Sequence, residues 1–225
     1  MTTVLVVAAH PDDEALGCGG TMLRHKQAGD TVQVLFLADG ETARDAKAAD
    51  RIAARRAQAV AACEILGAEA PHFEQFPDNR MDTVPLLDVT KAVEKVVSAV
   101  KPSVVYTHHG GDLNVDHRVT QQAVMTACRP LPGSSVRSIY AFEVASSTGW
   151  AGLAQLPFAP ARFVDIDQQL SAKLRALHCY SDEMLAFPHV RSFEAVEALA
   201  RWRGASAGLP AAEAFEVLRE VVRVG

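Results

Sequence analysis

Short apolar runs recur along the chain, and each is followed by a longer segment with helical periodicity. The first run, Thr3 to Ala8, has the sequence TVLVVA and is apolar and rich in β-branched residues. A strand with one face in water alternates apolar and polar side chains, whereas a strand buried on both faces is apolar throughout. Strands of this second kind occur in parallel sheets that helices cover on both sides. The pattern therefore predicts an α/β fold with a mostly parallel sheet.

Five such runs alternate with seven candidate helices. We expect strands over residues 3–8, 31–37, 103–107, 138–142 and 162–166, and helices over 14–27, 46–66, 85–100, 117–128, 168–178, 193–202 and 211–222. This repetition favours a Rossmann-like three-layer sandwich, because an eight-stranded barrel needs more residues and more elements. The elements on both sides of a long loop at 145–161 belong to one pattern, so we expect a single domain over residues 1–225.

The charge balance excludes some classes of partner. The chain has 225 residues, with 22 Lys and Arg against 27 Asp and Glu, which gives a net charge of −5. This excess of acid argues against a nucleic-acid-binding face and against adsorption to an anionic membrane. The apolar runs are far shorter than the ~20 residues that span a bilayer, and no signal-peptide pattern is present. Four scattered cysteines are typical of reduced thiols, so we expect a cytoplasmic protein without an integral membrane segment.

Four ionisable residues stand within six positions directly after the first apolar run. The segment Ala9-His10-Pro11-Asp12-Asp13-Glu14 lies where a strand ends and a helix begins, and ligands of open α/β sheets bind at such strand ends. Helix capping explains one or two carboxylates, but a cationic His10 is unfavourable at a helix N-terminus. A metal ion explains the whole segment. His10 and Asp13 can point at one cation, and Asp12 then remains beside it as a base for a metal-bound water.

A second polar loop follows the strand expected at 103–107. It runs His108-His109-Gly110-Gly111-Asp112-Leu113-Asn114-Val115-Asp116-His117-Arg118. Taken alone, it is compatible with a polar loop in which Asp116 caps the next helix. Together with the first loop, it supplies His117 as a third ligand, and two histidines with one carboxylate and a water form a hydrolytic zinc arrangement. Asp116 can then fix the tautomer of a ligating histidine from outside the ligand set.

Two further segments give weaker indications. Arg80, in a polar turn at 76–82, can reach a phosphate or a hydroxyl-rich ligand, although a solvated turn explains it equally well. The string Gly17-Cys18-Gly19-Gly20 lies inside the first expected helix and lacks the G-x-G-x-x-G spacing of a dinucleotide site. We interpret these glycines as close packing between that helix and the sheet.

These motifs resemble those of the PIG-L (LmbE-like) family of zinc-dependent N-acetylglucosaminyl deacetylases. The resemblance covers nearly the whole chain and rests on the strings at 9–21 and 112–118 and on Arg203-Gly204 with the later residues 212–215. It implies a Rossmann-like fold, with His10, Asp13 and His117 as ligands of one Zn²⁺ per chain and Asp12 as general base. Fe²⁺ or another divalent ion fits the same ligand types.

The chain departs from the family pattern at Asn114, where many members carry a histidine that helps to polarise the substrate carbonyl. A neutral amide can donate a hydrogen bond to an oxyanion, but it cannot release a proton at neutral pH. We expect Asn114 or a nearby histidine to be a second donor to the carbonyl oxygen. The general acid stays open between Asp12, His109 and His108, and we also expect His108 and Arg80 to contact the substrate.

The resemblance implies a hydrolase that releases acetate and a free amine from a small N-acetylated amino sugar or glycoconjugate. A homo-oligomer is compatible with it. An amidase acting on a larger acyl or conjugated group remains an alternative. Two other classes also stay open: a mononuclear iron oxygenase and a non-catalytic sugar binder. Neither of these has a use for Asp12 beside the ligands.

Overall fold

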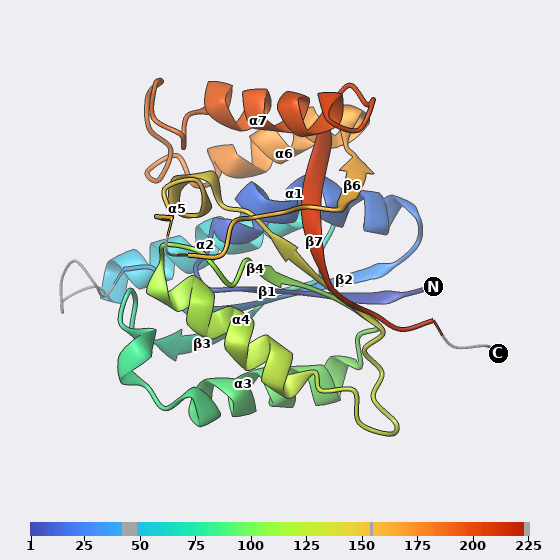
Figure 1. The fold of residues 1–225 in the computed structure, drawn as a ribbon. Coiled ribbons are helices and arrows are strands. Elements are labelled where there is room, and N and C mark those ends of the chain that lie inside the picture. Colours follow the sequence, from blue (N-terminus) through green and yellow to red (C-terminus); the bar gives the residue numbers. More distant parts are fainter. Residues whose placement is uncertain (42–48, 154, 223–225) are drawn as a thin grey trace.

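A seven-stranded sheet lies between two layers of helices (Figure 1). A computed structural model of the chain describes residues 1–41, 49–153 and 155–222, and the strands follow the order β3-β2-β1-β4-β5-β7-β6. The strands are β1 (Thr3–Ala8), β2 (Thr31–Ala38), β3 (His72–Phe76), β4 (Val104–His108), β5 (Ser138–Phe142), β6 (Arg162–Asp165) and β7 (Ala212–Glu220). The helices are α1 (Asp13–Gln27), α2 (Ala49–Ile65), α3 (Leu86–Val100), α4 (Val115–Ala127), α5 (Ala145–Thr148), α6 (Leu170–His178) and α7 (Phe193–Ala205), with 3-10 turns η1 (Met81–Thr83) and η2 (Asp167–Gln169).

The central strand β1 accounts for the layered arrangement. It pairs in parallel with β2 on one side and with β4 on the other. Val4 and Val6 pack with side chains of α1, α2 and α6, whereas Leu5 and Val7 pack with side chains of α3 and α4. Full burial of each such side chain contributes roughly 1.5–3 kcal/mol by removing apolar surface from water. The continuous apolar run thus serves two helical layers, and the predicted Rossmann-like three-layer fold with a mostly parallel sheet is confirmed.

The C-terminal segment is a strand, and the helix predicted over 211–222 is wrong. β7 lies between β5 and β6 and runs antiparallel to both. Its sequence, AEAFEVLRE, is rich in Ala, Glu and Leu, which favour helices. The first four residues of β7 are buried in succession, so no alternation marks the segment as a strand. Pairing on both sides overrides the local preference.

The remaining elements follow the sequence pattern, with boundaries that differ by a few residues. The helix predicted over 46–66 begins outside the described residues, and its described part is α2. The expected loop at 145–161 contains the short helix α5, and β3 joins the outer edge of β2 as an additional strand. A methyl group on Gly17 would lie 2.2 Å from the Phe142 ring, and one on Gly20 would lie 2.7 Å from Ile166. The predicted close packing of α1 on the sheet is therefore confirmed.

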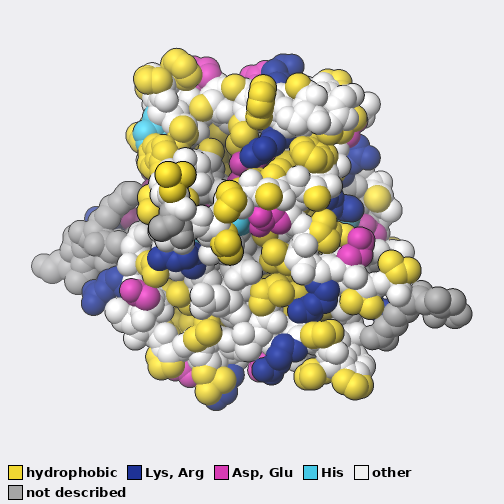
Figure 2. Space-filling model, in the orientation of Figure 1, with side chains coloured by type: hydrophobic (Ala, Val, Ile, Leu, Met, Phe, Trp, Pro, Cys, Tyr) yellow, Lys and Arg dark blue, Asp and Glu magenta, His cyan; other side chains and the backbone are white. Residues whose placement is uncertain are grey.

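The surface carries side chains of both charge signs. On the face shown in Figure 2, Lys and Arg are interspersed with Asp and Glu, and small hydrophobic areas lie between them. All four cysteines lie in the described part of the chain and are free thiols, and Cys18, Cys63 and Cys128 are buried. Among the described residues, we find no helix that combines the length and the apolar character needed to cross a bilayer.

The strand order creates a switch point between β1 and β4. The chain leaves β1 toward β2 and β3 on one side, and then returns to β4 on the other side. Connections that diverge in this way leave a crevice at the carboxyl ends of the two strands, where ligands of such sheets bind. The two polar loops of the sequence begin at these strand ends. The fold therefore brings together the two segments that carry the candidate ligands.

Candidate metal centre and catalytic pocket

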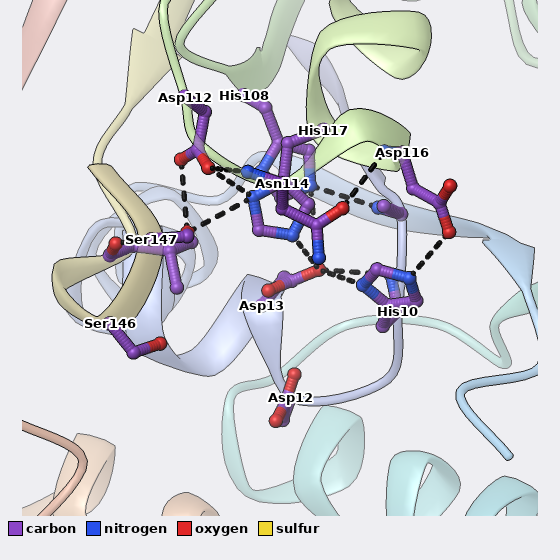
Figure 3. A network of polar contacts seen from close by, with 12 residues as sticks. His10, Asp12, Asp13, His108, Asp112, Asn114, Asp116, His117, Ser146 and Ser147 are labelled. Atoms are coloured by element: carbon purple, nitrogen blue, oxygen red, sulfur yellow. Dashed lines mark hydrogen bonds and ion pairs between the residues drawn. The ribbon is translucent and has the colours of Figure 1, made fainter. Parts of the chain in front are cut away.

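His10, Asp13 and His117 meet at the ends of β1 and β4. Asp13 Oδ2 lies 3.3 Å from His10 Nδ1 and 3.3 Å from His117 Nε2 (Figure 3). One ligand atom from each residue falls within 4.8 Å of the others, a spacing that suits a single cation. We call these three residues the ligand cluster. Two imidazole nitrogens and one carboxylate oxygen are donors that zinc and iron both accept.

The orientation of His10 is set by Asp116, the second residue of α4. His10 Nε2 lies 3.0 Å from Asp116 Oδ2. The Asp116 carboxylate also accepts hydrogen bonds from the backbone N–H groups of Asn79 (2.6 Å) and Met81 (2.9 Å). A carboxylate held in this way keeps the proton on Nε2 and leaves Nδ1 facing Asp13. Asp116 thus lies where the sequence predicts a residue that fixes a histidine tautomer.

His117 is oriented by a matching carboxylate on its other side. Its Nδ1 lies 3.2 Å from Asp112 Oδ1. Asp112 Oδ2 in turn accepts hydrogen bonds from the hydroxyls of Ser147 (3.0 Å) and Thr148 (2.6 Å) in α5. His117 Nε2 and Asp13 Oδ1 are buried without a hydrogen-bond partner among the described residues. Buried polar atoms are nearly always satisfied, so the unpartnered Nε2 of His117, which faces Asp13 Oδ2, fits the coordination of a metal ion.

The electrostatics of the ligand cluster favour a positive charge. Burial by itself disfavours a charged His10, but Asp116, Asp13 and Asp78 raise its pKa well above the ordinary value. Burial likewise opposes ionisation of Asp13, yet the nearby His117 holds its pKa well below the usual range. Asp13 is therefore a carboxylate, and the surrounding acids attract a cation to the place where its oxygen and the two ring nitrogens converge.

Asp12 lies next to the ligand cluster in a strained conformation. Its backbone has φ 125° and ψ −28°, a region that non-glycine residues rarely occupy and that costs about 1–3 kcal/mol. The backbone N–H of Asp12 donates to Glu14 Oε2 (3.0 Å), and its carboxylate accepts from Arg191 (3.1 Å). Burial raises the pKa of Asp12 to about 6, although Arg191 opposes the shift. The strained turn directs the carboxylate of Asp12 toward Arg191 and that of Asp13 toward His10 and His117.

Asn114 caps α4 and reaches the same pocket. Its Oδ1 accepts from the backbone N–H of Asp116 (2.8 Å), and its Nδ2 donates to Asn79 Oδ1 (3.1 Å). The cap fixes the amide, and both Asn114 and Asn79 are among the residues that line the pocket. The amide has two N–H donors, so one remains for a ligand when the other is bonded to Asn79.

An open pocket gives access to this arrangement. It is lined by His10, Pro11, Asp12, Gly40, Arg55, Asp78, Asn79, Asn114, Glu183 and Arg191. Asp13 and His117 are fully buried beneath it. Glu183 and Arg191 were not predicted from the sequence, and both come from the connection between α6 and α7. That connection contains charged residues in a segment without periodicity, and such a pattern alone does not distinguish a pocket wall from a solvated loop.

The other predicted residues lie outside the pocket lining. His108 is fully buried, accepts the Ala9 N–H at its Nε2 (2.9 Å) and stacks on His117 with 3.9 Å between ring centroids. His109 is buried as well, with Nδ1 2.6 Å from Glu216 Oε2 and Nε2 2.8 Å from the Leu156 carbonyl oxygen. His108 Nε2 also lies 3.5 Å from Asp13 Oδ2, and neither histidine is among the described residues that line the pocket. Arg80 is exposed, at the start of η1, and is not among the described residues that line the pocket.

Comparison with known proteins places this site in a family. The family model described as PIG-L: GlcNAc-PI de-N-acetylase matches residues 5–128, a segment that contains the ligand cluster, Asp12 and Asn114. The chain belongs to the PIG-L family. The matched segment runs from β1 to the end of α4, so it includes both polar loops and the switch point between them.

Relatives cover most of the chain. An uncharacterized deacetylase of Escherichia coli K12, YaiS, is 31% identical over 77% of this chain and 88% of its own length. A 1D-myo-inositol 2-acetamido-2-deoxy-alpha-D-glucopyranoside deacetylase of Mycobacteroides abscessus is 29% identical over 82% of this chain and 83% of its own length. The crystal structure of GalB, the 4-carboxy-2-hydroxymuconate hydratase of Pseudomonas putida, matches with a TM-score of 0.76 and 24% identity over 100% of this chain and 99% of that one. The fold is thus shared by proteins with different reactions, and the reaction has to be argued from the site.

Proposed function

We propose that the protein is a metal-dependent hydrolase that removes the N-acetyl group from an acetamido sugar or glycoconjugate and releases acetate and a free amine. The observation that carries this proposal is a carboxylate, Asp12, held beside the ligand cluster by a strained turn and by Arg191. A site that only binds a cation or a sugar has no need for this strain. Membership of the PIG-L family and the deacetylase relatives support the same reaction class.

His10, Asp13 and His117 would hold one divalent cation, for which we propose Zn²⁺, with Fe²⁺ as the alternative. When bound, such a cation acidifies a water molecule and polarises the amide carbonyl. Asp112 and Asp116 keep the two imidazoles in the tautomers that ligation requires. The chain itself thus supplies both the ligands and the groups that orient them.

Asp12 and Asn114 would act on the reacting amide. Asp12 accepts the proton of the attacking water as the new C–O bond forms, and Asn114 Nδ2 donates to the carbonyl oxygen as negative charge develops on it. Asp12 then returns the proton to the nitrogen as the C–N bond breaks. Asp12 lines the pocket whereas His108 and His109 do not, which favours Asp12 over these histidines as general acid.

Charge in the pocket argues for a neutral sugar over the unsaturated acid that the name of GalB indicates. Asp12, Asp78 and Glu183 line the pocket, and they face two guanidinium groups, those of Arg55 and Arg191. Arg55 is bonded to Glu41 and Glu183, and Arg191 to Asp12 and Glu183. The three acids outnumber the two guanidinium groups, each of which is already paired with acids, so the pocket disfavours a substrate with several carboxylates.

The test is a panel of N-acetylated sugars incubated with protein loaded with Zn²⁺ or Fe²⁺, scored for acetate and for free amine. We expect N-acetylglucosamine, its β-linked dimer N,N'-diacetylchitobiose or an N-acetylglucosaminyl inositol to yield equal amounts of both products, and the anionic UDP-N-acetylglucosamine to yield less of each. A chelator should abolish the reaction, and added metal should restore it. Absence of acetate from every member of the panel with the loaded protein contradicts the proposal.

A further inference from the structure

A second pocket opens beside the catalytic one. We call it the Trp150 pocket, and it is lined by Ser146, Trp150, Asp182, Glu183, Leu185, His189 and Arg191. Glu183 and Arg191 also line the catalytic pocket, so the two pockets share a wall of two charged side chains. A ligand that occupies the catalytic pocket and is longer than one ring can reach past this wall into the Trp150 pocket.

Trp150 contributes a large aromatic surface to this pocket. The residue is 52% exposed, whereas its partner in the pocket, His189, is partly buried. The two rings meet at right angles (88°), with 5.5 Å between their centroids, and this contact restrains the indole while half of the residue stays open to solvent. The face of an indole is electron-rich, and it attracts the polarised C–H groups that line one face of a sugar ring.

The short helix α5 connects Trp150 to the ligand cluster. The backbone N–H of Trp150 donates to the backbone carbonyl oxygen of Ser147 (3.2 Å). The hydroxyls of Ser147 and Thr148 donate to Asp112, which orients His117. In Figure 1, α5 lies below the connection between α6 and α7, which supplies the rest of the pocket wall. Trp150 thus has a defined place relative to the residues that would act on the acetamido group.

The polar side chains of the Trp150 pocket favour a neutral ligand with hydroxyl groups. Asp182 and Glu183 provide two carboxylates against one guanidinium, that of Arg191. Arg191 already donates to Asp12 (3.1 Å), Glu183 (3.3 Å) and Ser146 Oγ (2.8 Å). A phosphate or carboxylate would lie near these two acids and a guanidinium that is already paired with Asp12 and Glu183, whereas sugar hydroxyls donate readily to carboxylates.

We infer that the Trp150 pocket binds the second ring of a glycoside whose first ring carries the acetamido group. The inference rests on the proposed function and narrows its substrate to a neutral saccharide of two or more rings. The second ring stacks on Trp150, and its hydroxyls donate to the carboxylates of Asp182 and Glu183. The substrate is thereby selected on a ring that takes no part in the reaction.

Steady-state kinetics with a matched control test this inference. Trp202 in α7 is 67% exposed and lines neither pocket, so W202A controls for the loss of an exposed indole from the chain. We expect W150A to raise KM for N,N'-diacetylchitobiose about tenfold, and to leave KM for N-acetylglucosamine unchanged. W202A should change neither value. Equal effects of W150A on both sugars, or no effect on either, would overturn the inference.

Tryptophan fluorescence separates this inference from the proposed function. The chain has two tryptophans, so metal-loaded W202F reports on Trp150 alone, and W150F reports on Trp202 alone. With N,N'-diacetylchitobiose added and emission read within seconds, we expect a saturable change in W202F and none in W150F. If the emission of W202F does not change when the sugar is added, the inference is overturned even when acetate is released. A saturable response without acetate release supports the pocket and contradicts the deacetylase.

Discussion

His10 and His117 each use one ring nitrogen to contact a buried carboxylate and turn the other toward Asp13. Asp116 and Asp112 provide these carboxylates, and both are fully buried. A carboxylate behind a ligating imidazole selects its tautomer and increases its basicity. The affinity of the site for a cation therefore depends on residues that do not touch the cation.

This dependence predicts that Asp112→Asn weakens metal binding roughly 10- to 100-fold, because the amide no longer holds the proton on His117 Nδ1. Competition with a chromophoric chelator measures the affinity. Asp88→Asn, at an exposed position of α3, provides the control and should bind metal as the wild type does. Equal affinities for all three proteins would contradict the assigned role of Asp112.

We expect a substitution at Asp12 to reduce catalysis without reducing metal binding. Asp12→Asn keeps the shape of the side chain but removes the base, so we expect kcat to fall by about 10²–10⁴-fold. Metal content should remain at one ion per chain, because Asp12 lies outside the ligand cluster. Metal analysis together with acetate release checks both parts. A variant that loses its metal would show that Asp12 is a ligand and not the base.

At the scale of elements, the end of β4 separates two neighbouring histidines. His108 is the last residue of β4 and stacks on His117, whereas His109 turns to Glu216 in β7. Successive residues at a strand end point to opposite sides, so two adjacent histidines reach different environments. The His109–Glu216 contact connects β4 to the antiparallel strand β7 across β5.

The His109–Glu216 contact predicts a pH-dependent part of the stability. Burial lowers the pKa of His109, but Glu216 and the Leu156 carbonyl raise it above its ordinary value overall. A raised folded-state pKa gives stability that is present below the unfolded pKa of about 6.5 and is lost as pH rises through the folded value. His109→Gln should therefore cost about 2 kcal/mol near pH 6 and less near pH 9.

Urea unfolding at both pH values checks this prediction. Glu216→Gln should show the same trend, because it removes the other half of the pair. Both variants should leave metal binding unchanged, since His109 contacts none of the ligand cluster in the described structure. A cost for His109→Gln that grows from pH 6 to pH 9 would contradict the assigned charge.

At the scale of the whole molecule, the ligand cluster joins segments that are far apart in the sequence. His10 and Asp13 follow β1, and His117 lies in α4 more than a hundred residues later. Its supporting carboxylates reach further, to the turn at Asn79 and Met81 and to α5. A cation bound there links most of the carboxyl-end loops of the sheet to one another.

Metal binding should therefore raise the global stability. A ligand that binds only the folded state adds about 2.7 kcal/mol at a concentration of 100 times its Kd. We expect thermal unfolding of the metal-free protein to shift upward by several degrees when Zn²⁺ is added. His117→Gln should lose this shift, and His178→Gln, at an exposed position of α6, should retain it. A shift of equal size in His117→Gln would contradict the ligand cluster.

Most of the fold follows from local patterns. The continuous apolar run of β1 requires burial on both faces, and the amphipathic period of α3 requires one buried face, whatever the rest of the chain does. The local sequence pattern does not predict β7, because its helix-favouring residues form a strand only when β5 and β6 pair with it on both sides. Pairing of that kind is a property of the folded molecule, since it depends on strands more than forty residues away along the chain.

Some residues of the candidate site were likewise predicted from local sequence, whereas others are brought to it only by the tertiary structure. His10, Asp12 and Asp13 lie within one turn, and Asn114, Asp116 and His117 lie within another, so sequence adjacency alone determined their chemistry and grouping. Arg191 reaches Asp12 across 179 positions. Trp150 shares a pocket with Arg191 only because α5 packs against the α6–α7 connection. Short-range geometry is encoded by neighbouring residues, whereas the pocket walls depended on the packing of separate elements, which no local pattern records.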